Sequence, residues 1–163
     1  MQATSTLTLP RTLNNFPPIF WGGLIGGTLD ITAAIILLGL RGSGPIQVLQ
    51  SVASGLLGMD AYQGGIPTAL LGLFCHFLIA TTAAAVYHFA SLKLKLLTQH
   101  PALCGLLYGI AVYLFMNFVV LPLSAFPHKI NYTPVVIARG MSVIMLCVGL
   151  PISLVNKYFS KTS

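Results

Sequence analysis

The stretch GGLIGGTLDITAA (Gly22–Ala34) places a single aspartate, Asp30, inside an otherwise apolar run. The chain has 163 residues, of which 56% are hydrophobic and only 6% are charged. Soluble domains carry about 25% charged residues, so this chain has too few polar side chains to cover a surface exposed to water. The composition predicts an integral membrane protein.

Four apolar segments are long enough to cross a bilayer, which takes about 20 residues in a helix. These predicted spans cover residues 19–40, 66–90, 101–123 and 134–155. We therefore expect an all-α fold, an integral membrane four-helix bundle that forms one domain. In sequence order the expected parts are an N-terminal segment (1–18), the transmembrane domain (19–156) and a short tail (157–163).

The connection between the first two spans, GSGPIQVLQSVASGLLGMDAYQGG, is too long for a simple turn and nearly uncharged. Over residues 45–57 its apolar and polar side chains separate with a helical period of 3.6. The apolar face holds Ile46, Leu49, Val52, Ala53, Leu56 and Leu57. The polar face holds Gln47, Gln50, Ser51 and Ser54. The pattern predicts an additional amphipathic helix, which either lies in the membrane interface or enters the bilayer as a re-entrant element.

The loop charges predict the orientation of the chain, because basic residues accumulate in cytoplasmic loops. The two termini and the loop 91–100 carry five positive charges: Arg11, Lys93, Lys95, Lys157 and Lys161. The opposite side carries Arg41 and Lys129, partly offset by Asp60, with Arg139 just inside the fourth span. We therefore expect both termini to be cytoplasmic.

Small residues recur at helical spacing in the spans, which allows helix backbones to approach closely in lipid. The first three spans contribute Gly22, Gly23, Gly26, Gly27, Gly72, Ala80, Ala84, Gly105 and Gly109. The pattern is weaker in the fourth span, where Ala138 and Ser142 are four residues apart and Gly149 follows. These positions are predicted to form the helix contacts of the bundle.

Polar residues continue these stripes and are expected to face the bundle interior. At 1.5 Å per residue, Asp30 and His76 lie about 15 Å below the outer surface, whereas Asn117 and Arg139 lie about 8 Å below it. The counting predicts two polar tiers, Asp30 with His76 and Asn117 with Arg139. An Asp30–Arg139 pair is the main alternative, and Arg139 could instead extend to the membrane surface.

A charged aspartate at the centre of a span costs roughly 2.5 to 3.5 kcal/mol, so Asp30 requires a partner or must be neutral. Our favoured interpretation is a structural hydrogen bond or ion pair between helices for both Asp30 and His76. Proton or ion handling is the alternative. His88, on the same predicted helix as His76, is expected at the cytoplasmic interface.

Several functional classes find no support in the sequence. No HExxH, GxSxG or P-loop pattern occurs, and the three cysteines form no CxxC pair. No basic stripe interleaved with aromatic residues indicates nucleic-acid binding. We therefore predict a protein that is not an enzyme, with no catalytic residues, no cofactor and no metal.

Five phrases resemble small, uncharacterised bacterial membrane proteins: GTLDITAA, VLQSVASGLLG, ALLGLFCHFLIA, YGIAVYLFMNFVVLPLS and VGLPISL. The resemblance is to four-span inner-membrane proteins, loosely the YagU-like group, and covers about residues 20 to 155. It implies four spans and a bacterial inner (plasma) membrane location. It implies no activity and no site residues.

The leading functional hypothesis is a non-enzymatic multi-pass membrane protein with a role in interaction, assembly or membrane homeostasis. The alternative is a small oligomeric transporter or channel-like protein, proton-coupled through Asp30 and His76. The expected partners are the lipid bilayer and either a second copy of the chain or another membrane protein.

Overall fold

Long helices form nearly all of the computed structural model, which describes residues 15–127 and 132–160; within these ranges there is no strand. Four helical segments are long and apolar enough to cross a membrane: Phe16–Gly39, Gly65–Lys93, Pro101–Leu123 and Pro134–Ser160. The predicted all-α, four-span architecture is therefore confirmed. Arg11, Lys129 and Lys161, on which part of the predicted orientation depends, lie outside the described residues.

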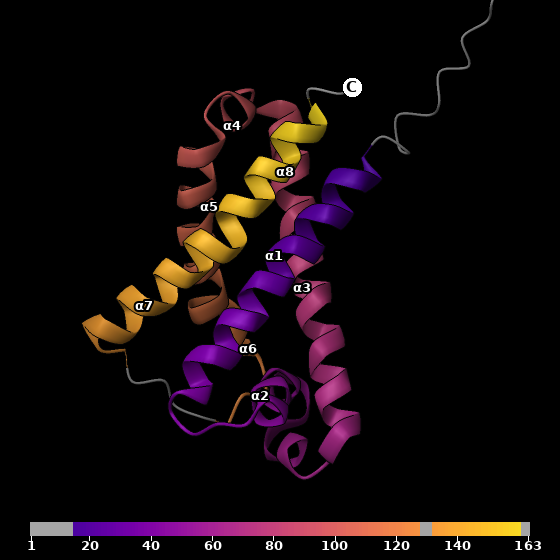
Figure 1. Cartoon of the computed structure of the whole chain (residues 1–163), viewed down its shortest axis with the longest axis vertical. Coiled ribbons are helices and arrows are strands. Elements are labelled where there is room, and N and C mark those ends of the chain that lie inside the picture. The colour runs from indigo at the N-terminus through magenta and orange to yellow at the C-terminus, as the bar shows by residue number, and fades with distance from the viewer. Residues whose placement is uncertain (1–14, 128–131, 161–163) are drawn as a thin grey trace, which may run out of the picture.

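The spans are arranged in an order that differs from their order in the chain (Figure 1). Helix α1 (Phe16–Gly39) packs against α3 (Gly65–Lys93) on one side and α8 (Leu150–Ser160) on the other. Helix α8 in turn packs against α5 (Pro101–Phe115). The short α4 (Leu96–Gln99) connects α3 to α5. Helices α1 and α8 are thus central, and α3 and α5 flank them.

Two spans contain a wider, π-helical turn. In the third span, η2 (Met116–Val120) separates α5 from α6 (Leu121–Leu123), and in the fourth, η3 (Met145–Gly149) separates α7 (Pro134–Ile144) from α8. Each π segment ends two residues before a proline, Pro122 or Pro151. Because proline has no N–H, the carbonyl four residues earlier lacks its usual helical donor, and an altered turn accommodates this.

Helix α2 (Pro45–Leu57) has the bounds predicted for the short helix and is followed by a 3-10 turn, η1 (Gly58–Tyr62). Its start is stabilised by the Gln47 side chain, whose oxygen accepts from the Gly44 N–H at 3.1 Å. Figure 1 shows α2 nearly end-on, crossing one end of the bundle. The bundle therefore has four spans and one crosswise helix.

The polar face of α2 is partly buried, and its apolar face is partly exposed. Gln50, Ala53 and Ser54 are buried, whereas the apolar Ile46 and Leu56 are 48% and 65% exposed. The Gln50 side chain explains the preference, because its amide donates to the Gly65 carbonyl at the start of α3, at 3.0 Å. Part of the polar face of α2 is thus directed into the protein, and part of its apolar face points outward.

The hydrophobic core lies where α3 meets the fourth span. It consists of Ala84, Tyr87, Val148 and Ile152. Tyr87 also contacts α5, where its ring meets that of Tyr108 edge-on at 5.0 Å, and the Tyr108 hydroxyl donates to the Ala83 carbonyl. These contacts close the half of the bundle that contains the C-terminal end of α8.

Candidate functional site

The overlapping glycine pairs of α1 serve two different neighbours. Gly23 and Gly27 face α3: a Cβ atom on Gly23 would lie 2.6 Å from the Thr81 Cα, and one on Gly27 would lie 2.9 Å from the Phe77 ring. Both distances are too short for any side chain, so glycine is required for α1 and α3 to approach this closely.

Gly22 and Gly26 face α8 and η3, with less tight spacing. A Cβ on Gly26 would lie 3.5 Å from the Ile152 side chain and 3.6 Å from the Cys147 carbonyl oxygen, which are ordinary contact distances. A Cβ on Gly22 would meet Ala84 at 3.3 Å, and Ala80 and Ala84 of α3 are themselves buried. The α1 stripe thus packs on both sides.

The tightest contact between spans joins the third and the fourth. A Cβ on Gly109 would lie 3.0 Å from the Met145 backbone nitrogen, and one on Gly149 would lie 2.8 Å from the Gly109 Cα. Gly105 meets Gly149 and Ser153 in the same way. The GxxxG pair of the third span therefore packs directly on the π segment η3.

Gly72 has a different role from the other glycines. A Cβ there would lie 2.8 Å from the Leu49 carbonyl carbon and 3.2 Å from the Ala53 nitrogen, both in α2. Gly72 therefore seats the crosswise helix on α3, instead of bringing two spans together.

Asp30 and His76 interact electrostatically where α1 packs against α3. The His76 Nε2 lies 2.8 Å from the Gly27 carbonyl oxygen of α1; because a carbonyl only accepts, Nε2 carries the proton. Asp30, one turn further along α1, is half-buried and interacts electrostatically with His76 and with the Cys147 thiol. The mid-span site therefore involves α1, α3 and η3.

The structure does not bring Asn117 and Arg139 together. The Asn117 side chain, within the π segment η2, donates to the Tyr113 carbonyl of α5, 2.8 Å away. Arg139 is exposed and makes no hydrogen bond or ion pair within the part of the chain that the structure describes. The outer polar tier is therefore absent, and Arg139 does not face the interior.

A buried polar cluster that sequence reasoning missed lies at the other end of the bundle. His88 is only 7% exposed, so its side chain faces the protein interior. Its ring nitrogens lie 2.7 Å from the Asn156 side-chain oxygen of α8 and 3.2 Å from that of Asn15, at the start of α1. Asn156 also donates to the Ser91 hydroxyl. His88 continues the four-residue stripe of α3, the one sequence signal for its burial.

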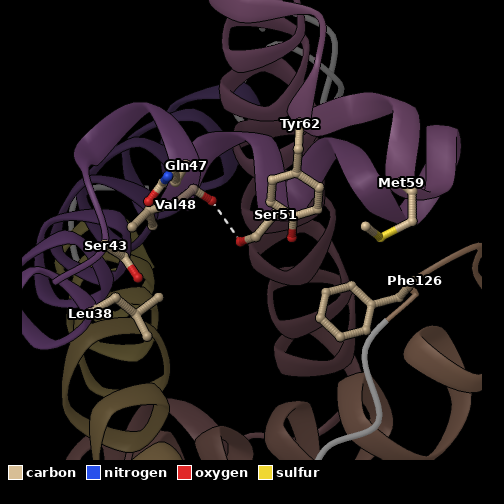
Figure 2. Close-up of a pocket in the computed structure, with 8 residues that line it drawn as sticks. All are labelled: Leu38, Ser43, Gln47, Val48, Ser51, Met59, Tyr62 and Phe126. Carbon is tan, nitrogen blue, oxygen red and sulfur yellow. Dashed lines mark hydrogen bonds between the residues drawn. The ribbon is translucent and has the colours of Figure 1, made fainter. Parts of the chain in front are cut away.

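A cavity of about 490 Å³ opens beneath α2, at the opposite end from the His88 cluster. Figure 2 shows its lining, which carries hydroxyl, amide, aromatic and aliphatic groups but no charge. The lining residues are Leu38, Ser43, Gln47, Val48, Ser51, Met59, Tyr62 and Phe126. Ser51 donates to the Val48 carbonyl of its own helix.

Among the described residues, no group of three or more histidine, cysteine, aspartate or glutamate side chains could hold a metal ion. Of the two polar sites, the mid-span one contains a carboxylate beside an imidazole, which are groups able to exchange a proton. The His88 cluster consists of an imidazole, amides and a hydroxyl, and ties the ends of three helices together.

Comparison with protein-family models, with curated proteins and with solved structures finds no match for the chain. The functional argument therefore depends on the geometry of the molecule.

Proposed function

We propose that this is a non-enzymatic membrane protein that acts by associating with a partner inside the bilayer, through the exposed face of α7. The observation that carries the proposal is that none of the 11 residues of α7 is buried. Figure 1 shows α7 projecting from the edge of the bundle, on the far side from α3. This segment of the fourth span packs so little that it leaves a surface for another helix.

The exposed face of α7 has the composition of a helix-packing surface. Val135, Ala138, Arg139 and Ser142 are all exposed and follow one another at intervals of one or three residues along the helix. Ala138 and Ser142 form the small-residue pair that allows a helix to approach closely in lipid. Arg139 adds a charge about 8 Å below the surface, counted from Pro134. A partner that covers this face would supply the counter-charge that Arg139 lacks among the described residues.

A bulky substitution tests this proposal. Ala138→Leu should reduce the mass of the complex extracted from native membranes in polymer-bounded lipid discs. Leu78→Phe is the matched control, because Leu78 is 56% exposed on α3, away from α7. If the Ala138→Leu complex keeps the wild-type mass, α7 is not the association surface.

The location is part of the same proposal: a bacterial inner membrane with cytoplasmic termini. The support is the excess of lysine and arginine on the side of the termini and the resemblance to four-span inner-membrane proteins. A reporter that is active only in the periplasm should be silent when fused after Ser163. Activity of that fusion would reverse the orientation.

A transport function is the second candidate, favoured by the electrostatic interaction between Asp30 and His76, which residue counting puts about 15 Å below the outer surface. Ionisable pairs at this depth commonly serve proton pathways. The test is pH-driven flux in proteoliposomes, with Asp30→Asn compared with wild type at equal folded protein. Loss of flux in the variant supports transport, and absence of flux in the wild type removes it.

A further inference from the structure

The chain itself carries a side chain that matches Arg139 in charge. The sequence has only two acidic residues. Asp30 is half-buried beside His76, whereas Asp60 in η1 is exposed and makes no side-chain hydrogen bond or ion pair within the described residues. Asp60 is therefore the one acidic side chain of this protein that is free to meet a basic group of another molecule.

Asp60 and Arg139 lie at the same end of the bundle. The backbone N–H of Ala125, in the segment that leads to α7, donates to the Gly55 carbonyl of α2 at 2.9 Å, which ties the two connections together. Arg139 begins about 8 Å below that surface, a depth that a long arginine side chain can span to place its guanidinium near the headgroups. Both charges can thus reach the same membrane level.

We propose that the partner of α7 is a second copy of this chain, in a two-fold dimer in which Arg139 of each protomer pairs with Asp60 of the other. The proposal depends on the proposed function above and names its partner. A two-fold interface is self-complementary, so one exposed acid and one exposed base produce two equivalent ion pairs. Each pair neutralises a charge in the apolar surroundings of α7.

Charge complementarity favours this occupant over an anionic lipid. Two copies with a formal charge of +6 each repel in general, so dimerisation needs local pairs of opposite sign at the interface. Asp60 and Arg139 provide them, and the small side chains of Ala138 and Ser142 leave room for the second helix beside Arg139. An anionic headgroup would also neutralise Arg139, but it would leave the small-residue face and Asp60 without a role.

The experiment measures dimerisation of the full-length chain in liposomes, by energy transfer between fluorescently labelled copies as they are diluted in lipid. Arg139→Asp and Asp60→Arg each place like charges opposite one another in a homodimer. Each should weaken self-association at least about tenfold, because like-charge contacts cost more than 1.4 kcal/mol. Helical circular dichroism establishes that both variants are folded.

The decisive measurement mixes the two single variants, Arg139→Asp and Asp60→Arg. In a heterodimer of these variants, the two substituted positions meet at one contact, with an acid on one chain and a base on the other. The second contact keeps the native pair, because each variant retains the side chain that the other has lost. Both contacts are complementary, so the mixture should associate as strongly as wild type although neither variant does alone. The double variant Arg139→Asp/Asp60→Arg should also regain wild-type dimerisation.

The outcomes separate this inference from the proposed function. If the wild type is monomeric in liposomes, yet Ala138→Leu shrinks the complex from native membranes, the partner is another protein and the inference is overturned alone. If the wild type dimerises and Ala138→Leu weakens the dimer, but the mixture of charge variants does not recover, the Asp60–Arg139 pairing is wrong. If Ala138→Leu changes neither measurement, both proposals are overturned.

Discussion

The two ends of the bundle differ in how completely they are packed. Toward the C-terminal end of α8, the side chains of His88, Asn156 and Ser91 are buried and bonded to one another. Toward α7 there is a cavity beneath α2, and a span segment without a buried residue. One end has the packing of a complete bundle. The other leaves the whole of α7 without a buried residue.

The largest expected effect comes from disrupting the backbone contact between the third and fourth spans. Gly149→Ala would place a Cβ 2.7 Å from the Gly109 backbone nitrogen, and two backbones cannot move apart without separating the spans. We expect a loss of about 2 to 3 kcal/mol in the free energy of unfolding, measured by SDS titration in mixed micelles. The control is Gly26→Ala, whose nearest neighbour lies at 3.5 Å and which should be close to neutral. Equal losses of unfolding free energy for Gly149→Ala and Gly26→Ala would contradict the close backbone contact at Gly149.

The second largest effect on the free energy of unfolding is expected in the buried polar cluster around His88. His88→Ala removes the imidazole nitrogens that lie beside the side-chain oxygens of Asn15 and Asn156, which should cost about 2 kcal/mol of unfolding free energy. His100→Ala, at an exposed histidine, is the matched control and should have no effect. Equal unfolding free energies for His88→Ala and His100→Ala would contradict a stabilising role for the His88 cluster.

The mid-span hydrogen bond should contribute less. His76→Phe keeps an aromatic ring but removes the donor to the Gly27 carbonyl, and we expect a loss of about 1 kcal/mol in the same titration. His76→Gln retains an N–H donor and should recover part of that loss. A His76→Phe protein as stable as wild type would show that the bond between α1 and α3 contributes nothing.

The smallest effect is expected at Ser51, one of two serines of α2 that form a matched pair. Ser51 lines the outer cavity, so Ser51→Leu should change the unfolding free energy by no more than about 0.5 kcal/mol. Ser54, three residues further on, is fully buried, and Ser54→Leu should cost about 1 to 3 kcal/mol through overpacking. Thermal unfolding of both variants in detergent compares them directly. A large loss at Ser51 would mean that the space beneath α2 is filled.

The sequence predicts well what depends on one helix at a time. Hydropathy locates the four spans, and the 3.6-residue period selects Gly23, Gly27 and Gly109, because close approach requires small residues on one face. The proximity of Asp30 and His76 also follows, because depth is counted along two straight helices. Each of these predictions needs no knowledge of which helices are neighbours.

Contacts between distant parts of the chain cannot be predicted by counting residues along a single helix. Asn15 and Asn156 lie at opposite ends of the described sequence, so nothing local indicates that both reach His88. The buried face of α2 depends on a hydrogen bond from Gln50 to Gly65, which is a tertiary contact. The exposure of Arg139 follows from the position of α7 beside the rest of the bundle, which its own amphipathic pattern does not reveal.

The π segment η3 determines how far α7 is rotated about the helix axis relative to α8. A turn closed by i to i−5 bonds, such as that from the Leu150 N–H to the Met145 carbonyl, holds one residue more than an α-helical turn. Removing that residue would rotate α7 by about 100° relative to α8. Arg139 and the small residues beside it would then point in a new direction, while the tight contacts of α8 stayed in place. A single residue thus sets the direction in which α7 presents its outward face.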